Sequence, residues 1–205
     1  MDTSSKKIGI YSGSFDPVHN GHIEFAEAAL RQVRLDKVYF LPEGLHRTKR
    51  GTTHFAHRLA MLKLATQDHQ KLEVLELPDK QFSVAKTLPR LNQKFVDDEL
   101  FMLIGSDILD HLPDWPLIDR LLARLRLIIA IRQGTSSDHL NDVLKELDVY
   151  SSSVLLESPQ PALSSRQIRQ SLLTGHTPHK LNPNVLNYIK QNWLYASPSN
   201  SSSAS

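Results

Sequence analysis

The sequence predicts an α/β fold in which a doubly wound parallel sheet carries helices on both faces and C-terminal helices packed back on the domain. Two observations lead to this prediction, the alternation of apolar patterns along the chain and the length of the chain. Short apolar runs alternate with longer segments in which apolar residues recur at helical spacing, and such alternation gives right-handed crossovers between parallel strands. At 205 residues the chain has the length of one domain with a sizeable core. The predicted arrangement is Rossmann-like.

Six apolar runs rich in Ile, Val, Leu, Tyr and Phe predict the strands. They are continuous, as expected of strands that are buried on both faces. In chain order they are 8–12, 37–41, 72–77, 100–104, 126–131 and 153–156.

Helices are predicted in the segments between the strands and after the last of them. The five between strands are 22–33, 57–67, 83–94, 116–123 and 138–147, and the two C-terminal ones are 164–173 and 183–194. Pro183 suits the first turn of its helix, because proline there lacks only an N–H that has no helical partner.

Composition narrows the class of protein. The net charge of +2 gives no broad electrostatic attraction for nucleic acid or a membrane surface. The absence of cysteine excludes disulfides, thiolate zinc sites and cysteine nucleophiles and is compatible with a reducing cytosol. No apolar run approaches the roughly 18 residues that span a bilayer. We therefore expect a cytoplasmic protein with one domain over 1–196 and a disordered Ser-rich tail over 197–205. The sequence is also compatible with a homo-oligomer.

The most informative segment is 8–22, in which an apolar strand runs into a glycine-containing turn with His19 and His22. A strand that ends in small residues and opens a helix directs backbone N–H groups and the positive helix end at one point, which favours a phosphate. In a doubly wound sheet this turn also lies where ligands collect. Taken alone, the two histidines are equally compatible with a surface turn and a helix cap.

The longer pattern resembles the signature of the nucleotidylyltransferase superfamily named for its His-x-Gly-His motif. It reads Gly13-Ser14-Phe15-Asp16-Pro17-Val18-His19-Asn20-Gly21-His22. The resemblance implies that His19 and His22 stabilise charge on the transferred phosphate and that Gly13, Phe15 and Gly21 contact ATP. Ser14 is then expected at both ATP and the acceptor phosphate, while Asp16 and Pro17 shape the turn.

A second segment, Ser164-Ser165-Arg166-Gln167-Ile168-Arg169, follows the sixth predicted strand. By itself it is compatible with an N-cap and a solvated helix face. In the same superfamily a Ser-Ser-x-x-Ile-Arg segment binds the ATP phosphates, which implies ATP contacts for Ser164, Ser165, Ile168 and Arg169. Arg166 stands where the family usually has a small residue. Arg169 is the third predicted catalytic residue, on the β and γ phosphates.

A third segment narrows the resemblance to the bacterial nicotinate-mononucleotide adenylyltransferases. Gly105 and Asp107 match a turn of the nucleotide site, and Trp115 matches a residue that stacks on the pyridine ring. Without the resemblance, these residues suit a glycine turn, a helix cap and a core tryptophan. The remaining expected acceptor-binding residues are Phe82, Ser83, His46 and Lys49. Pro116 departs from the family, because proline cannot donate the backbone N–H expected to hold the nicotinate carboxylate.

The resemblance implies adenylyl transfer from ATP to nicotinate mononucleotide, giving nicotinate adenine dinucleotide and pyrophosphate. The alternatives are transfer to nicotinamide mononucleotide or phosphopantetheine, and a non-catalytic nucleotide-binding module. Mg²⁺ is expected to arrive with ATP, and no resident metal site is predicted. His54 with His57, and His176 with His179, lack a third ligand at metal-binding spacing. The expected partners are ATP and a mononucleotide, with no nucleic acid polymer and no membrane.

Overall fold

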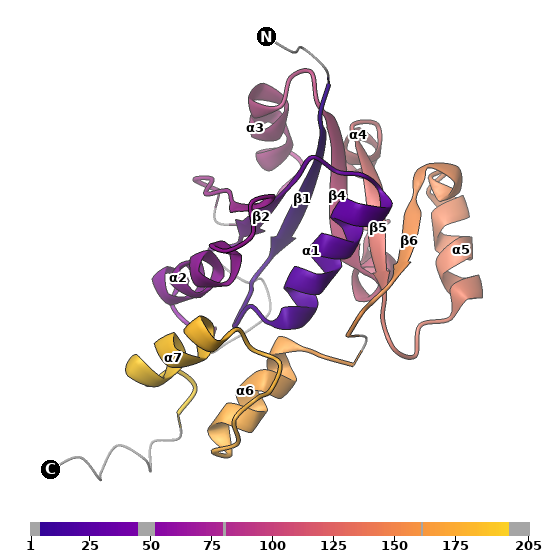
Figure 1. Cartoon of the computed structure of the whole chain (residues 1–205). Coiled ribbons are helices and arrows are strands. Elements are labelled where there is room, and N and C mark those ends of the chain that lie inside the picture. The colour runs from indigo at the N-terminus through magenta and orange to yellow at the C-terminus, as the bar shows by residue number, and fades with distance from the viewer. Residues whose placement is uncertain (1–4, 45–51, 80, 161, 197–205) are drawn as a thin grey trace, which may run out of the picture.

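Six parallel strands form the sheet at the centre of the computed structural model, which describes residues 5–44, 52–79, 81–160 and 162–196 (Figure 1). The strands are β1 (Lys7–Gly13), β2 (Lys37–Pro42), β3 (Leu72–Val74), β4 (Glu99–Gly105), β5 (Leu125–Ile131) and β6 (Val154–Glu157). Their order is β3-β2-β1-β4-β5-β6, and every pairing is parallel. The predicted doubly wound sheet is confirmed.

Among the described residues, seven α-helices cover the sheet where the sequence predicts them. They are α1 (Asn20–Gln32), α2 (Phe55–Thr66), α3 (Thr87–Lys94), α4 (Ile118–Leu122), α5 (Ser137–Glu146), α6 (Ser165–Leu173) and α7 (Pro183–Gln191). Buried residues of α1, α2, α6 and α7 share one hydrophobic cluster with one face of the sheet. Those of α3, α4 and α5 pack on the other face. The C-terminal helices therefore pack back on the domain, as predicted.

Three predicted elements extended three residues or more beyond the observed ones. Strand β3 ends at Val74 rather than 77, and α7 ends at Gln191 rather than 194. Helix α3 begins at Thr87 rather than at 83, because Thr87 Oγ1 accepts from the Ser83 N–H at 3.0 Å and closes a turn ahead of the helix. Two 3₁₀ helices were not predicted, η1 (Ser106–His111) and η2 (Tyr150–Ser152).

The order of the strands places the site. Strand β1 pairs with β2 on one side and with β4 on the other, so the chain reverses its direction of travel across the sheet between β1 and β4. Ligands of such sheets bind at this reversal, beyond the carboxyl ends of the strands. The loops that follow β1, β2, β4 and β5 therefore surround one point.

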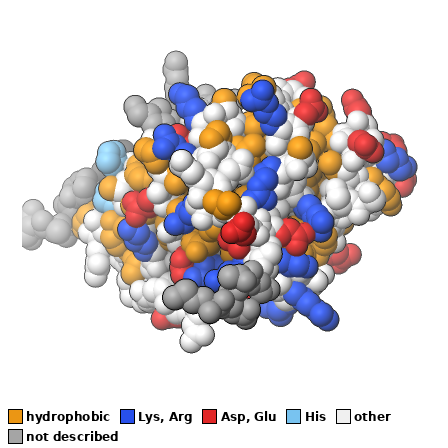
Figure 2. All heavy atoms as spheres, turned by 90° about the horizontal axis from the view of Figure 1, so that it is seen from above, with side chains coloured by type: hydrophobic (Ala, Val, Ile, Leu, Met, Phe, Trp, Pro, Cys, Tyr) orange, Lys and Arg blue, Asp and Glu red, His pale blue; other side chains and the backbone are white. Residues whose placement is uncertain are grey.

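Surface charge and helix length are two further properties of this fold. On the face seen in Figure 2, Lys and Arg side chains are interspersed with Asp and Glu, in keeping with the small net charge. Within the part of the chain that the structure describes, no helix is long and apolar enough to cross a membrane. The predicted tail, 197–205, lies outside the described residues.

Candidate active site

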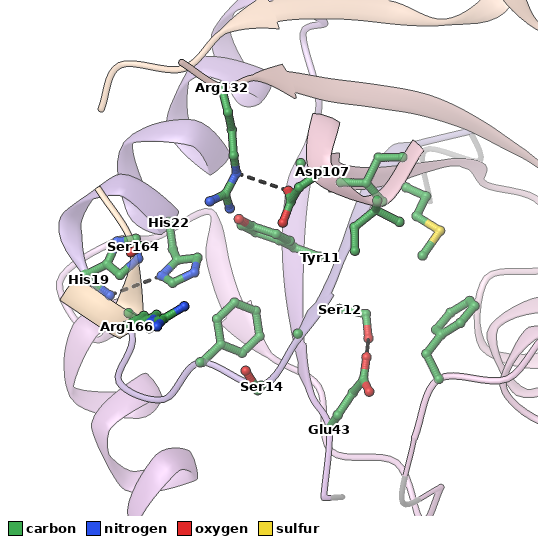
Figure 3. A pocket seen from close by; sticks show the side chains of 18 of the residues that line it. Tyr11, Ser12, Ser14, His19, His22, Glu43, Asp107, Arg132, Ser164 and Arg166 are labelled. Atoms are coloured by element: carbon green, nitrogen blue, oxygen red, sulfur yellow. Dashed lines mark hydrogen bonds and ion pairs between the residues drawn. The ribbon is translucent and has the colours of Figure 1, made fainter. Parts of the chain in front are cut away.

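A cavity of about 320 Å³ opens at the carboxyl ends of the strands and collects most of the predicted site residues (Figure 3). Those that line it are Gly13, Ser14, Phe15, His19, His22, Phe82, Gly105, Asp107, Trp115, Ser164 and Ser165. Gly21 lines a small adjoining recess together with His19 and His22. The three sequence motifs thus meet at one cavity.

Besides Arg169, which is described below, four other predicted residues are placed differently or are not described. Ile168 is buried in the core, and Ser83 closes the turn ahead of α3. Neither lines the cavity in the described part of the chain. His46 and Lys49 lie outside the described residues.

The two histidines form a stacked pair at the start of α1. His19 is the N-cap residue with extended backbone, and His22 is the third helical residue. The Nδ1 atom of His22 accepts a hydrogen bond from the His19 backbone N–H at 3.2 Å, and the two rings stack with centroids 3.7 Å apart. An accepting Nδ1 carries no proton, so the neutral His22 ring has its proton on Nε2.

Burial keeps both rings neutral. Burial, together with the positive charge of Arg132, lowers the pKa of His19 to about 3. Burial also holds the pKa of His22 well below 6.5, with further contributions from His19 and Arg132. At neutral pH the pair therefore offers neutral N–H donors rather than imidazolium charges.

These depressed pKa values predict a loss of stability in acid. Between pH 6.5 and about 3 the unfolded chain binds protons at His19 that the folded protein does not, so lowering the pH across this window favours unfolding. We expect the melting temperature to fall from pH 7 to pH 4, and to fall less steeply in His19→Gln. The exposed His139→Gln serves as the control, and an identical slope in His19→Gln would count against a buried neutral ring.

Two backbone features let the histidines stack at this place. Phe15 has φ 46°, in the left-handed region that a bulky residue rarely adopts, and its buried ring packs edge-on against His22 at 5.2 Å. Gly21 lies directly under His19, because a Cβ at this position would come within 3.1 Å of the His19 Nδ1 atom. The glycine of the motif thus makes room for a histidine ring inside the protein.

Asp16 fixes the turn that leads into His19. Its Oδ1 accepts from the Tyr195 hydroxyl at 2.6 Å, and its Oδ2 accepts from the Thr53 N–H at 3.3 Å. The Arg169 guanidinium donates to the Asp16 backbone carbonyl at 2.6 Å, and the Ser165 hydroxyl donates to that of Pro17 at 2.9 Å. The first turn is therefore tied to α6 and to the C-terminal segment.

This places Arg169 differently from the expectation. Among the described residues it does not line the cavity, whereas Arg166 does. The contact of Arg169 with the ATP phosphates stays a prediction, and its observed bond assigns it a part in shaping the turn.

Removal of the Tyr195 hydroxyl tests the connection to Asp16. A hydrogen bond to a buried carboxylate contributes about 1.5–3 kcal/mol, so Tyr195→Phe is expected to lower the free energy of unfolding by about that amount. Urea denaturation measures it. The exposed Tyr150 gives the control Tyr150→Phe, and equal midpoints for the two variants would refute the connection.

Arg132 is a site residue that the sequence analysis missed. It directly follows β5 and lines the cavity. Its Nε lies 3.1 Å from Asp107 Oδ1, and its backbone N–H donates to Ser106 Oγ at 3.1 Å. Gly105 leaves space for this ion pair, since a Cβ at Gly105 would come within 2.3 Å of the same Asp107 oxygen and would displace its side chain. The sequence signal that could have identified Arg132 is its position directly after a predicted strand.

Two aromatic side chains and an acidic one form another part of the cavity lining. The rings of Phe82 and Trp115 lie with centroids 6.0 Å apart, a surface on which a planar ring can pack. Glu43, which the sequence analysis also missed, accepts from the Ser12 hydroxyl at 3.0 Å. The cavity thus combines anion-binding groups with an aromatic surface.

The other histidines have structural or surface positions. His54 caps α2, and His57 Nδ1 lies 3.0 Å from the Tyr188 hydroxyl. His176 and His179 are exposed. Within the described ranges no three His, Asp or Glu side chains cluster as metal ligands.

Comparisons with known proteins identify the family of this chain. The cytidylyltransferase-like family matches residues 10–171. The nicotinate-nucleotide adenylyltransferase of Bacillus subtilis (strain 168) is 34% identical over 198 residues, covering 94% of this chain and 100% of the relative. A probable nicotinate-nucleotide adenylyltransferase of Endomicrobium trichonymphae is 36% identical over 196 residues, covering 92% of this chain and 98% of the relative.

A solved structure supports the fold. The Plasmodium falciparum nicotinic acid mononucleotide adenylyltransferase complexed with NaAD superimposes with a TM-score of 0.79 at 20% identity, covering 93% of this chain and 97% of that one. The matched family and the curated relatives show that the chain belongs to the cytidylyltransferase-like family and, within it, to the nicotinate-nucleotide adenylyltransferases.

Proposed function

We propose that this enzyme transfers the adenylyl group of ATP to nicotinate mononucleotide, forming nicotinate adenine dinucleotide and pyrophosphate. One observation carries the proposal: a single cavity joins the neutral histidine pair at the start of α1 to the aromatic pair Phe82 and Trp115. The first suits a phosphate and the second a flat base. An enzyme that joins two nucleotides through their phosphates needs both.

The phosphate part of the site lies around the start of α1. The positive end of the α1 dipole lies there, and the neutral His22 presents its Nε2 proton. Arg132 and Arg166 line the same cavity and supply positive charge for the triphosphate. Arg169 is kept as a proposed contact of the leaving pyrophosphate.

The reaction is a direct displacement. An oxygen of the acceptor 5′-phosphate attacks the α-phosphorus of ATP, and the bond from that phosphorus to the bridging α–β oxygen breaks, so that pyrophosphate leaves with its electron pair. No protein nucleophile is required, and the protein contributes positioning and charge stabilisation. Neutral imidazole N–H groups stabilise the developing charge without accepting or losing a proton.

The acceptor lies against the aromatic surface. Ser14 and the neighbouring amides hold its phosphate near the α-phosphorus, and the pyridine ring packs on the surface that Phe82 and Trp115 form. Pro116 supplies no N–H for the nicotinate carboxylate. The carboxylate therefore needs another donor in this protein.

Mg²⁺ is proposed to arrive on the phosphate oxygens of ATP, where it neutralises charge on the leaving pyrophosphate. Asp107, which pairs with Arg132, is one of the two carboxylates that line the cavity. No all-protein cage is proposed, since the described residues hold no cluster of three ligands. We further propose a cytoplasmic location, where ATP and pyridine mononucleotides are available.

A pyrophosphate-release assay tests the proposal. ATP or CTP is offered with nicotinate mononucleotide, nicotinamide mononucleotide or phosphopantetheine, and the highest kcat/KM is expected for ATP with nicotinate mononucleotide. Turnover with phosphopantetheine alone would overturn the choice of acceptor. ATP binding without pyrophosphate release on any acceptor would identify a non-catalytic nucleotide-binding module.

A further inference from the structure

Glu43 places a carboxylate in a cavity that is also lined by Arg132, Arg166 and a second carboxylate, Asp107, which pairs with Arg132. It directly follows β2, and its backbone N–H donates to the Gly13 carbonyl at 2.9 Å, which extends the pairing of β1 with β2 by one residue. Its own carbonyl accepts from the buried Arg58 at 2.8 Å. The main chain of Glu43 is therefore fixed against the first motif.

The side chain of Glu43 is held as well. The Ser12 hydroxyl donates to Oε1 at 3.0 Å (Figure 3), and both residues line the cavity. A carboxylate can accept about four hydrogen bonds, and the bond from Ser12 orients the group. Oriented in this way, the carboxylate is part of the cavity wall.

Its position along the cavity is intermediate. Ser12 is two residues before Ser14, on the proposed phosphate side of the acceptor. On the other side, Glu43 and Phe82 together line a second small recess that adjoins the cavity, so Glu43 also borders the aromatic surface. In a mononucleotide the ribose joins the phosphate to the base. The ribose of an acceptor bound in this way passes Glu43.

The chemistry of a carboxylate fits the hydroxyl groups of a ribose. An ionised carboxylate only accepts hydrogen bonds, and bonds to it are about twice as strong as neutral ones. A vicinal diol offers two donors, whereas the carboxylate of a nicotinate ring offers none. In dinucleotide-binding sheets an acidic residue downstream of the glycine turn likewise accepts from a ribose hydroxyl.

We propose that Glu43, held by Ser12, recognises the acceptor by accepting hydrogen bonds from its ribose 2′- and 3′-hydroxyl groups and so selects ribonucleotide acceptors. The inference rests on the proposed function. It adds a specificity-determining residue to the acceptor part of the site, and it does not depend on which pyridine base the acceptor carries.

The test compares acceptors that lack one hydroxyl. kcat/KM is measured with nicotinate mononucleotide and with its 2′-deoxy and 3′-deoxy analogues, at saturating ATP, for the wild type and for Glu43→Gln. In the wild type, loss of a hydroxyl bonded to Glu43 is expected to lower kcat/KM by about 10- to 100-fold. In Glu43→Gln the penalty for at least one deoxy analogue should shrink to about threefold, with the KM for ATP unchanged.

Two further variants make the result specific. Glu157→Gln, at the end of β6 and exposed, is the matched control and should keep the wild-type penalties. Ser12→Ala removes the bond that orients Glu43 and should reduce the penalty in the same direction as Glu43→Gln. Melting temperatures of all variants establish that each is folded.

Equal deoxy penalties in the wild type and Glu43→Gln would overturn the inference. The inference would also be overturned if Glu43→Gln changed the preference between nicotinate and nicotinamide mononucleotides and left the deoxy penalties intact. Glu43 would then contact the base. If the wild type uses only nicotinamide mononucleotide, the proposed function fails while the deoxy series on that nucleotide still tests Glu43. A wild type that accepts no ribonucleotide overturns both.

Discussion

Replacing His22 by alanine is expected to lower kcat by about 10²-fold or more, the scale of losing one preorganised donor to a developing charge, while the protein remains folded. The substitution removes the Nε2 proton that the neutral ring directs into the cavity. Because this donor acts mainly in the transition state, KM for ATP should change less than kcat. Steady-state pyrophosphate release measures both constants.

Two variants separate this role from a structural one. His22→Gln keeps a neutral N–H donor at the end of a side chain of similar reach, and it should recover part of the lost kcat. His179→Ala, at an exposed position, should behave as the wild type. Turnover of His22→Ala near the wild-type rate would remove His22 from the catalytic account.

Arg58 carries the largest expected effect on stability. Its side chain is buried, with 1% of the residue exposed, and it donates to the backbone carbonyls of Ser14, Glu43, Gly44 and Thr53 at 2.6–3.1 Å. These carbonyls belong to the loops after β1 and β2, so one guanidinium joins the two loops. Arg58→Met leaves the carbonyls without this donor, at about 1–3 kcal/mol for each one that stays buried.

We expect Arg58→Met to lower the free energy of unfolding by about 4 kcal/mol, a large share of the total for a domain. Urea denaturation measures the change. Arg31→Met is the matched control, because Arg31 is exposed and lies 3.9 Å from Glu27, an ion pair that contributes little. Arg58→Lys should recover only part of the loss, since lysine lacks the planar fork. Equal midpoints for the Met variants at 58 and 31 would contradict this role.

The fold could be predicted because its signals are local. Each buried strand is a continuous apolar run, and each helix has its own apolar spacing, so no long-range information is needed to place them. The boundaries were less accurate where a side chain ends an element. Thr87 is an example, because its hydroxyl closes a turn where the apolar pattern predicts helix.

The site could be predicted only where a motif spans consecutive residues. His19, Gly21 and His22 lie within four positions, whereas Arg132 and Glu43 are single residues that the strand order brings to the same cavity. The role of Asp16 in the turn was expected, but its partner Tyr195 is 179 residues away. Arg58 has the sequence pattern of a solvated helix charge, and only the packing of two loops around it makes it internal.

The protonation of the histidines was also beyond the sequence. The residue types allow either a charged or a neutral ring, and burial together with Arg132 selects the neutral one. This choice determines how the site stabilises charge, because a neutral ring donates a hydrogen bond without carrying a full charge.

The central claim is a direct transfer of the adenylyl group between two nucleotides held in one cavity. Its most direct test is the stereochemistry at the transferred phosphorus, measured with ATP that carries sulfur at a chiral α-phosphorus and with nicotinate mononucleotide as acceptor. A single in-line attack predicts a dinucleotide with inverted configuration. Retention would reveal two displacements through an adenylylated protein, and would contradict the assignment of His19 and His22 as hydrogen-bond donors.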